Sequence, residues 1–267
     1  MRDYIEAIIL GIVQGLTEFL PISSSGHLEI FKFLLGDNKV GEYSLLMTVI
    51  LHGATALATL GVFRKQIWKG TRKLTDRGWN QSKQFFVAIL ISMIPAALAG
   101  FMFEDLIASM FEQKLNLVGF ALLVTAVLLW LADRVKTANK EIGWMEGVLI
   151  GIAQMFAIIP GLSRSGATIA TSILLKIDRG RAAQFSFLMV VPLIMGKMAK
   201  DLISLEWIDY PDPAALVVGF IAAFLSGWFA CKVMISIIRK SNLSYFSIYC
   251  LIAGICTILF SYGILHF

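Results

Sequence analysis

Two short cassettes place polar side chains inside otherwise apolar sequence. The first, at 11–27, reads GIVQGLTEFLPISSSGH, and the second, at 151–168, reads GIAQMFAIIPGLSRSGAT. At an offset of 140 positions identical residues coincide: Gly11 and Gly151, Gln14 and Gln154, Ser23 and Ser163, Ser25 and Ser165, Gly26 and Gly166. The chain therefore carries this cassette twice.

The first cassette contains candidate ligands for a metal ion. Gln14 and Glu18 lie one helical turn apart, so on a helix they face the same way. Paired oxygen ligands on one helix face suit a hard divalent cation, Mg²⁺ or Ca²⁺, which also binds phosphate oxygens. The sequence predicts such a cation at Glu18, with Gln14 either a second ligand or a hydrogen-bonding partner for a neighbouring helix.

A histidine follows three serines in the same cassette. Ser23, Ser24 and Ser25 immediately precede Gly26 and His27. Because histidine has a reference pKa of about 6.5, it can act as a general acid or base near neutral pH. A lone histidine is more often structural, but the neighbouring hydroxyl groups favour a catalytic role here.

His52 stands in the middle of an apolar segment, VILHGATALA. Such a histidine is usually a polar core residue with its hydrogen bonds satisfied. We therefore interpret His52 as a core residue, at most at the edge of a cavity.

Arg164 places a positive charge in an apolar part of the second cassette. A charged side chain at the centre of a bilayer costs about 2.5–3.5 kcal/mol on insertion scales, so this one needs a partner. Glu18 is the internal candidate and an anionic ligand is the other, since arginine makes bidentate contacts to phosphate. Arg164 can pair with Glu18 at one stage and bind an anionic ligand at another. A purely structural ion pair with Glu18 is the simpler alternative.

Hydroxyl groups and glycines surround Arg164 where a loop leads into an expected helix at 167–176. Backbone N–H groups at a helix N-terminus, together with hydroxyl groups and a cation, form a cradle for an anion. The candidate anion-binding residues are Gly161, Ser163, Ser165, Gly166 and Thr168.

The composition is that of a membrane protein. Hydrophobic residues make up 58% of the 267 positions, charged residues 15%, and the mean hydropathy is +0.78, well above the apolar share of soluble domains. A bilayer core requires about 20 apolar residues per helix, and six segments qualify: 43–63, 84–103, 117–132, 182–200, 214–235 and 243–265. The net charge of +5 comes from basic residues beside these segments, as in cytoplasmic loops, and indicates no nucleic-acid partner.

We expect each cassette in a helical hairpin that enters the membrane without crossing it. The apolar pieces 4–20 and 28–35 are separated by a proline, three serines and a glycine, and the second piece is too short to span. Non-helical backbone at membrane depth is tolerated only where protein or a water-filled cavity forms hydrogen bonds to its polar groups. The serine-rich tip of the hairpin should therefore line a cavity. One kinked span from 4 to 35 is the alternative. The second hairpin is expected at 145–176.

Loop charges predict the orientation of the chain. The loops at 64–83 and 133–142 are basic, whereas those at 104–116 and 201–213 are acidic on balance, and basic loops stay in the cytoplasm. Both termini are then expected outside. Each half comprises one hairpin and three crossings, so the second hairpin enters from the opposite face.

The expected fold is all-α: a polytopic membrane protein with an inverted-topology repeat, forming a single integral membrane domain. The first repeat covers 1–140 and the second 141–267. Hairpins that meet near the midplane place both cassettes around one site. Secondary transporters share this architecture, so transport or flipping of a lipid phosphate or another anion is the alternative function.

The two cassettes resemble the signatures of the bacterial undecaprenyl-pyrophosphate phosphatases, also called bacitracin-resistance proteins. The resemblance to this family covers essentially the whole chain. The first signature, E or Q, three residues, E, then a serine-rich P-x-S-S-x-G-H turn, corresponds to Gln14, Glu18, Pro21, Ser23, Ser24, Gly26 and His27. The second, P-G-x-S-R-S-x-x-T, corresponds to Pro160, Gly161, Ser163, Arg164, Ser165 and Thr168. Many members carry Glu where this chain has Gln14, which removes one negative charge from the metal site.

The resemblance implies hydrolysis of undecaprenyl pyrophosphate to undecaprenyl phosphate and inorganic phosphate, which returns the lipid carrier to cell-wall synthesis. It implies a multi-pass protein of the bacterial cytoplasmic membrane with its active site open to the outer face. The partners are then a polyprenyl pyrophosphate and the bilayer, and the sequence indicates no particular oligomeric state.

The reaction suits the candidate residues. A pyrophosphate needs its charge neutralised, its reacting oxygens aligned and a proton delivered. Arg164, a divalent cation near Glu18, the cradle and His27 can supply these. Ser24 is a candidate nucleophile for a phospho-enzyme intermediate, and attack by His27 or by an activated water are the alternatives.

Overall fold

The computed structural model describes residues 2–34, 40–110, 115–136, 140–204, 213–240 and 242–263. Within these residues the chain is helical apart from turns and one isolated bridge, so the expected all-α fold is confirmed. The helices are α1 (Arg2–Phe19), α2 (Ser24–Leu34), α3 (Val40–Arg72), α4 (Gln81–Met102), α5 (Glu104–Met110), α6 (Leu115–Asp133), α7 (Trp144–Phe156), α8 (Arg164–Leu174), α9 (Arg179–Ser204), α10 (Pro213–Arg239) and α11 (Leu243–Ser261).

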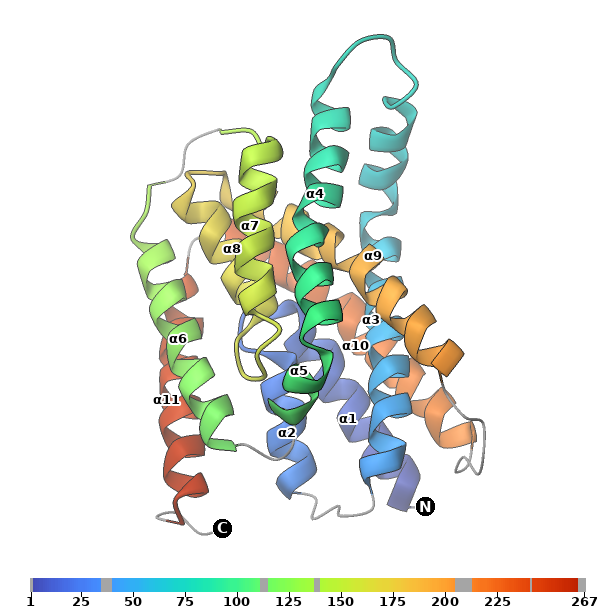
Figure 1. The fold of residues 1–267 in the computed structure, drawn as a ribbon, viewed down its shortest axis with the longest axis vertical. Helices are drawn as coiled ribbons and strands as arrows, with labels where there is room; N and C mark the ends of the chain where they lie inside the picture. The colour runs from blue at the N-terminus through green and yellow to red at the C-terminus, as the bar shows by residue number, and fades with distance from the viewer. Residues whose placement is uncertain are drawn as a thin grey trace.

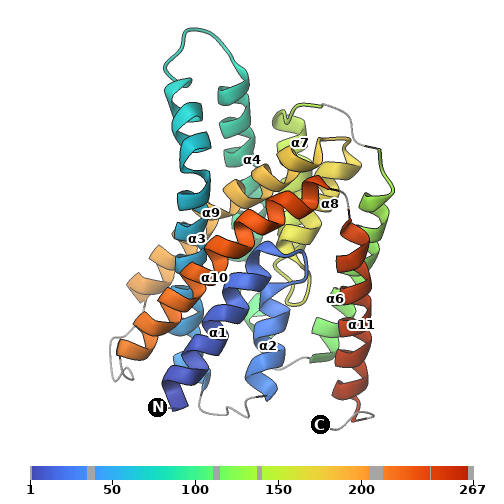
Figure 2. The same ribbon diagram turned by 180° about the vertical axis from the view of Figure 1, so that it is seen from behind.

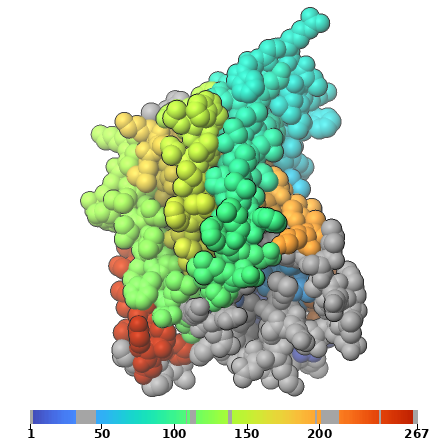
Figure 3. All heavy atoms as spheres, in the orientation of Figure 1, coloured from blue at the N-terminus to red at the C-terminus, as the bar shows by residue number. Residues whose placement is uncertain are grey.

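Among the described residues, six helices are long and apolar enough to cross a membrane: α3, α4, α6, α9, α10 and α11. They coincide with the six segments expected from the sequence. Large apolar side chains are exposed at helical spacing on the outer faces of α4, α6 and α10, namely Leu90, Ile94, Leu98, Phe120, Val124, Val127, Val217, Ile221 and Leu225. Such surfaces are typical of contact with lipid, and α4, α6 and α7 share one face of the molecule (Figure 3).

Two segments expected as loops are partly helical. Helix α3 continues through the basic residues to Arg72, and α5 occupies part of the expected loop at 104–116. The expectation for 64–83 was therefore wrong over its first half, because lysine, arginine and glutamine are good helix formers. The ends of α3 and α4 at this loop project beyond the other helices (Figure 1).

Both cassettes lie at the turn of a helical hairpin (Figures 1 and 2). Helix α1 runs from the end that carries the N-terminus to the middle of the molecule and α2 returns, while α7 and α8 do the same from the opposite end. The break between α1 and α2 excludes one continuous span. The second helices begin earlier than expected, at Ser24 and Arg164, because a serine caps each one. Ser23 Oγ accepts a hydrogen bond from the backbone N–H of Gly26 at 3.2 Å, and Ser163 Oγ accepts one from that of Gly166 at 3.0 Å.

Each hairpin packs on a helix from the other half of the chain. Helix α1 lies against α10, and α7 lies against α4. A Cβ on Gly11 would stand 2.5 Å from the carbonyl oxygen of Gly219, and a Cβ on Gly151 would stand 2.5 Å from that of Ser92. Only glycine permits such close approach, which is how small residues join helices in membranes. Both hairpins are thereby held in the centre of the molecule.

Candidate active site

The two hairpin tips touch each other. Ser165 Oγ donates a hydrogen bond to the carbonyl oxygen of Leu20 at 3.0 Å. A Cβ on Gly26 would stand 3.1 Å from the Cα of Gly161, which itself adopts a φ of 91° that favours glycine. Cassettes 140 positions apart in the sequence therefore form one site.

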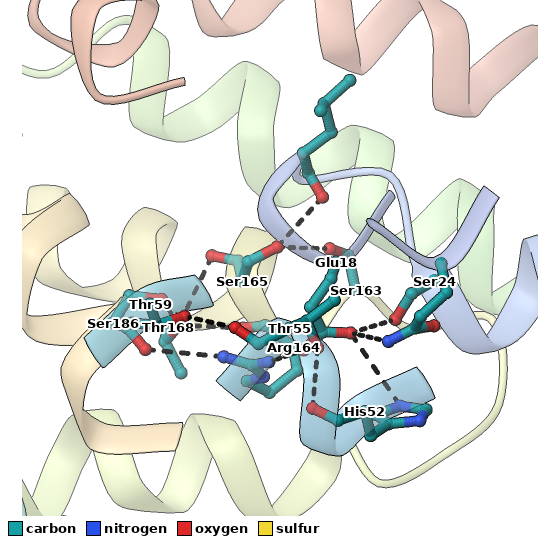
Figure 4. Close-up of polar contacts among 12 residues, drawn as sticks. Glu18, Ser24, His52, Thr55, Thr59, Ser163, Arg164, Ser165, Thr168 and Ser186 are labelled. Carbon is teal, nitrogen blue, oxygen red and sulfur yellow. Dashed lines mark hydrogen bonds and ion pairs between the residues drawn. The ribbon is translucent and has the colours of Figure 1, made fainter. Parts of the chain in front are cut away.

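The carboxylate of Glu18, at the end of α1, is the centre of this site (Figure 4). It is buried, and its Oε1 forms an ion pair with Arg164 of α8. Its Oε2 accepts hydrogen bonds from Gln14 Nε2 at 3.0 Å and from Ser24 Oγ at 2.8 Å. His52 of α3 brings Nε2 to 3.9 Å from the same oxygen. Helices α1, α2, α3 and α8 thus converge on one carboxylate.

Of the two partners predicted for Arg164, the structure places Glu18 beside it. Its guanidinium also donates to the carbonyl oxygen of Ser186 on α9 at 3.5 Å. Removing one partner of a buried ion pair typically costs about 3–5 kcal/mol, so the pair ties the two hairpins together. Thr55 and Thr59 of α3 and Phe187 of α9 line a narrow space beside this pair. The Arg164 side chain is 16% exposed, so it is not fully sealed in the core.

The predicted anion cradle gathers at the start of α8. Ser163 Oγ and Ser165 Oγ lie 3.3 Å apart, and Ser163 also holds the N–H of Gly166. Thr168 Oγ1 lies 2.6 Å from Ser186 Oγ. The side chains of Ser163, Ser165 and Thr168 are all buried. The residues of the cradle are therefore together, with their hydroxyl groups already hydrogen-bonded to one another or to α9.

The first hairpin repeats part of this arrangement. Ser23 Oγ and Ser25 Oγ also lie 3.3 Å apart, and Ser23 Oγ holds the N–H of Gly26. Ser24 differs from both neighbours, because its hydroxyl group is bonded to Glu18. Among the three serines, Ser24 is thus the one whose hydroxyl group contacts the Glu18 carboxylate.

The ring of His27 is hydrogen-bonded away from the carboxylate. Its Nδ1 donates to the carbonyl oxygen of Ser23 at 2.7 Å, since a carbonyl can only accept. In the neutral ring Nε2 then accepts from the hydroxyl group of Tyr249 on α11, at 2.6 Å, and the two rings are stacked. The structure therefore does not bring His27 to Ser24, and a catalytic role for His27 stays a prediction.

The Glu18 carboxylate and the amide oxygen of Gln14 fit a divalent cation that is shared with a substrate. Gln14 is fully buried, and its Oε1 has no hydrogen-bond partner in the described part of the chain. No group of three or more His, Cys, Asp or Glu side chains suited to a metal occurs among the described residues. Glu18 and Gln14 would supply only part of the coordination shell. Mg²⁺ is commonly held this way, by one or two protein oxygens together with substrate phosphates and water.

The sequence matches one protein family over most of its length. The family model described as "Bacitracin resistance protein BacA" matches residues 7–256, which include both cassettes. The chain belongs to this family. The BacA-type chain is 53% identical over 262 residues to the undecaprenyl-diphosphatase of Christiangramia forsetii, covering 98% of this chain and 99% of that one. It is 46% identical over 264 residues to the undecaprenyl-diphosphatase of Bacteroides fragilis, covering 97% and 98%. It is 36% identical over 281 residues to that of Methanobrevibacter smithii, covering 99% of each.

The site of this BacA family member also includes polar residues that the cassettes do not contain. His52, Thr55 and Thr59 follow one another at helical spacing on α3, beside Glu18 and Arg164 (Figure 4). Their spacing within an apolar helix was a readable signal that they share a face. Ser186 and Tyr249 gave no such signal, because only tertiary packing sets α9 and α11 against the hairpin tips. Of the two positions considered for His52, in the core or at the edge of a cavity, the structure places it beside the Glu18 carboxylate.

Proposed function

We propose that this protein hydrolyses undecaprenyl diphosphate to undecaprenyl phosphate and inorganic phosphate within the membrane. One observation carries the proposal: a buried Glu18–Arg164 pair, with the Ser24 hydroxyl group on the same carboxylate, lies where the two family signatures meet. A base, a hydroxyl group and a guanidinium in one place serve phosphoryl transfer. The relatives named undecaprenyl-diphosphatase support the choice of substrate. The apolar helices around the site offer a surface along which a polyprenyl chain can lie.

Ser24 is the proposed nucleophile. Its hydroxyl group already donates to Glu18 Oε2, so the carboxylate can take the proton as Oγ attacks the terminal phosphorus. The bond from that phosphorus to the bridging oxygen breaks, undecaprenyl phosphate leaves, and a phosphoserine remains for hydrolysis by water. His27 is the proposed proton carrier, which requires its ring to leave Tyr249.

Arg164 is the proposed phosphate-binding residue. When its guanidinium turns from Glu18 to the substrate, it stabilises the negative charge on the transferred phosphoryl oxygens. Ser163, Ser165 and Thr168, with Gly161 and Gly166, would bind the remaining oxygens at the start of α8, and Ser23 and Ser25 would do so from α2. Each hydroxyl group would exchange a hydrogen bond within the protein for one to the phosphate.

A divalent cation is proposed beside Glu18 and Gln14. When bound, such a cation neutralises pyrophosphate charge and polarises its oxygens. Glu18 would hold it through its carboxylate, and Gln14 through the buried Oε1 that lacks a partner among the described residues.

Phosphate release by purified protein tests the proposed function. In detergent micelles, where no transport is possible, the protein should release inorganic phosphate from undecaprenyl diphosphate. A chelator should slow the release, and added divalent cation should restore it. If no phosphate were released in micelles, while reconstituted vesicles moved a lipid phosphate across the bilayer, the protein would instead be a transporter.

The inverted-topology repeat within one membrane domain is part of the proposal. It is supported by the hairpins that enter from opposite ends (Figure 2) and by the exchange of partners, α1 with α10 and α7 with α4. We place the protein in the bacterial cytoplasmic membrane. From the loop charges we propose that both termini and the loops around 104–116 and 201–213 face outside, and that the active site opens to that face; residues 1, 111–114, 205–212 and 264–267 of these segments lie outside the described residues.

Single cysteines should report this orientation. In a background without Cys231, Cys250 and Cys256, an impermeant maleimide added to intact cells should label Asp105→Cys but not Thr75→Cys. Both positions are exposed, and they stand at opposite ends of the molecule. After permeabilisation both should react. Equal labelling of the two in intact cells would contradict the proposed topology.

A further inference from the structure

His52 stands at the Glu18 carboxylate, and the proposed reaction does not use it (Figure 4). Its Nδ1 lies 2.8 Å from the carbonyl oxygen of Thr48. Because a carbonyl oxygen can only accept, Nδ1 carries the proton, and Nε2 of the neutral ring has a free lone pair. A bond from one ring nitrogen to a backbone carbonyl is the usual support of a histidine that binds a metal through the other.

The distance between His52 and Glu18 is that of two ligands around one cation. Nε2 lies 3.9 Å from Glu18 Oε2, which is too long for a hydrogen bond. Two ligands that each stand about 2.1 Å from a shared metal are at most about 4.2 Å apart. Glu18 Oε2 already accepts hydrogen bonds from Gln14 Nε2 and Ser24 Oγ, so a cation bound to this oxygen would take the place of one of these two donors.

Two further observations point to a ligand here. Gln14, on the same face of α1 as Glu18, keeps a fully buried Oε1 without a partner in the described part of the chain. The His52 side chain is 27% exposed, so its ring is reachable and is not sealed in the core. One carboxylate and one imidazole nitrogen thus face each other, and the neighbouring Gln14 amide holds its Nε2 on the same carboxylate while its Oε1 has no partner in the described part of the chain.

We propose that His52 Nε2 is a ligand of the divalent cation at Glu18, and that this chain therefore favours a first-row transition metal ion over Ca²⁺. This inference rests on the cation of the proposed function. Imidazole suits transition metals, whereas Ca²⁺ and Mg²⁺ prefer oxygen ligands. Mn²⁺ takes carboxylate and carbonyl oxygens and is a spectroscopic probe for nitrogen ligands.

Mn²⁺ alone, added to protein without a polyhistidine tag, gives a direct test. Electron spin echo spectroscopy of bound Mn²⁺ should show coupling to a ¹⁴N nucleus in the wild type. The chain has three histidines, so the coupling can be assigned by substitution. It should disappear in His52→Gln and in His52→Asn, the second of which keeps a donor near the Thr48 carbonyl, and it should persist in His27→Ala. Mn²⁺ affinity should fall about tenfold or more in both His52 variants, with Mg²⁺ affinity nearly unchanged.

The outcomes separate this inference from the proposed function. Tight Mn²⁺ binding that needs Glu18, but shows no nitrogen coupling or keeps it in both His52 variants, overturns the role of His52 alone. Unchanged Mn²⁺ affinity in Glu18→Gln, or no saturable binding by the wild type, overturns both the cation site and His52 as its ligand. Hydrolysis itself is judged separately, by phosphate release from the same wild-type preparation.

Discussion

Replacing Arg164 with alanine should lower the rate of phosphate release from undecaprenyl diphosphate by at least about 10²–10³, the usual effect of removing a preorganised group that stabilises developing charge. Substrate binding should weaken as well, because the guanidinium contacts phosphate before and during the reaction. Both kcat and KM should therefore change, and steady-state phosphate release measures them. Arg164→Lys should recover only part of the rate, since an ammonium group cannot make the bidentate contact.

The same substitution should also destabilise the fold, so a matched control is needed. Arg179 forms the other buried arginine ion pair in the described residues, with Asp133 at 3.0 Å, away from the hairpin tips. Arg179→Ala should cost a comparable amount of stability, about 3–5 kcal/mol, yet leave kcat per folded molecule near the wild-type value. Arg164→Ala combined with Glu18→Gln should regain stability without regaining activity. Wild-type turnover by Arg164→Ala would contradict the catalytic interpretation.

Replacing Ser24 with alanine should lower kcat by at least about 10³, within the range expected when the nucleophile and its general base are uncoupled. The physical reason is the hydrogen bond from Ser24 Oγ to Glu18 Oε2, which prepares one hydroxyl group for deprotonation. Acid quenching during turnover of substrate labelled at the terminal phosphate should trap phosphoserine in the wild type and none in Ser24→Ala. Ser247→Ala removes another buried hydroxyl group, which donates to the Ala126 carbonyl, and should leave turnover intact.

His27→Ala completes this test. If His27 carries the proton, kcat should fall by about 10²–10⁴, while KM stays near its wild-type value. Tyr249→Phe should have a much smaller effect, because it removes only the partner that holds the ring in the present state. A modest loss in Ser24→Ala, together with a large loss in His27→Ala, would instead favour direct attack by His27 or by water.

Much of the fold could be predicted because its signals are local. Apolar runs of about 20 residues mark membrane helices, and α3, α4, α6, α9, α10 and α11 lie where such runs occur. The boundaries were less accurate. Helix α3 continues beyond its apolar segment and ends at Arg72, because the basic residues that follow the apolar segment also favour a helix.

The candidate site could be predicted only in part. The repeated cassettes placed Glu18, Ser24 and Arg164 in one site, and the structure brings these three side chains into contact. The catalytic role of His27 stays a prediction, because its ring is bonded to the Ser23 carbonyl and to Tyr249. A side-chain direction depends on the helix packed against it, which in this case comes from the far end of the chain.

The sequence by itself determined the class of fold, the two hairpins and the residue types that carry the chemistry, since composition, periodicity and repetition are properties of the chain alone. Only the tertiary structure decided that Arg164 pairs with Glu18, that Ser24 is the serine on the carboxylate, and that His52 stands beside it. These contacts depend on how closely α1 and α7 approach their partners, through Gly11 and Gly151. Glycines spaced four apart on α1 and α7 favour close helix approach, but the sequence does not say which distant helix each pair meets, because packing between distant segments decides it.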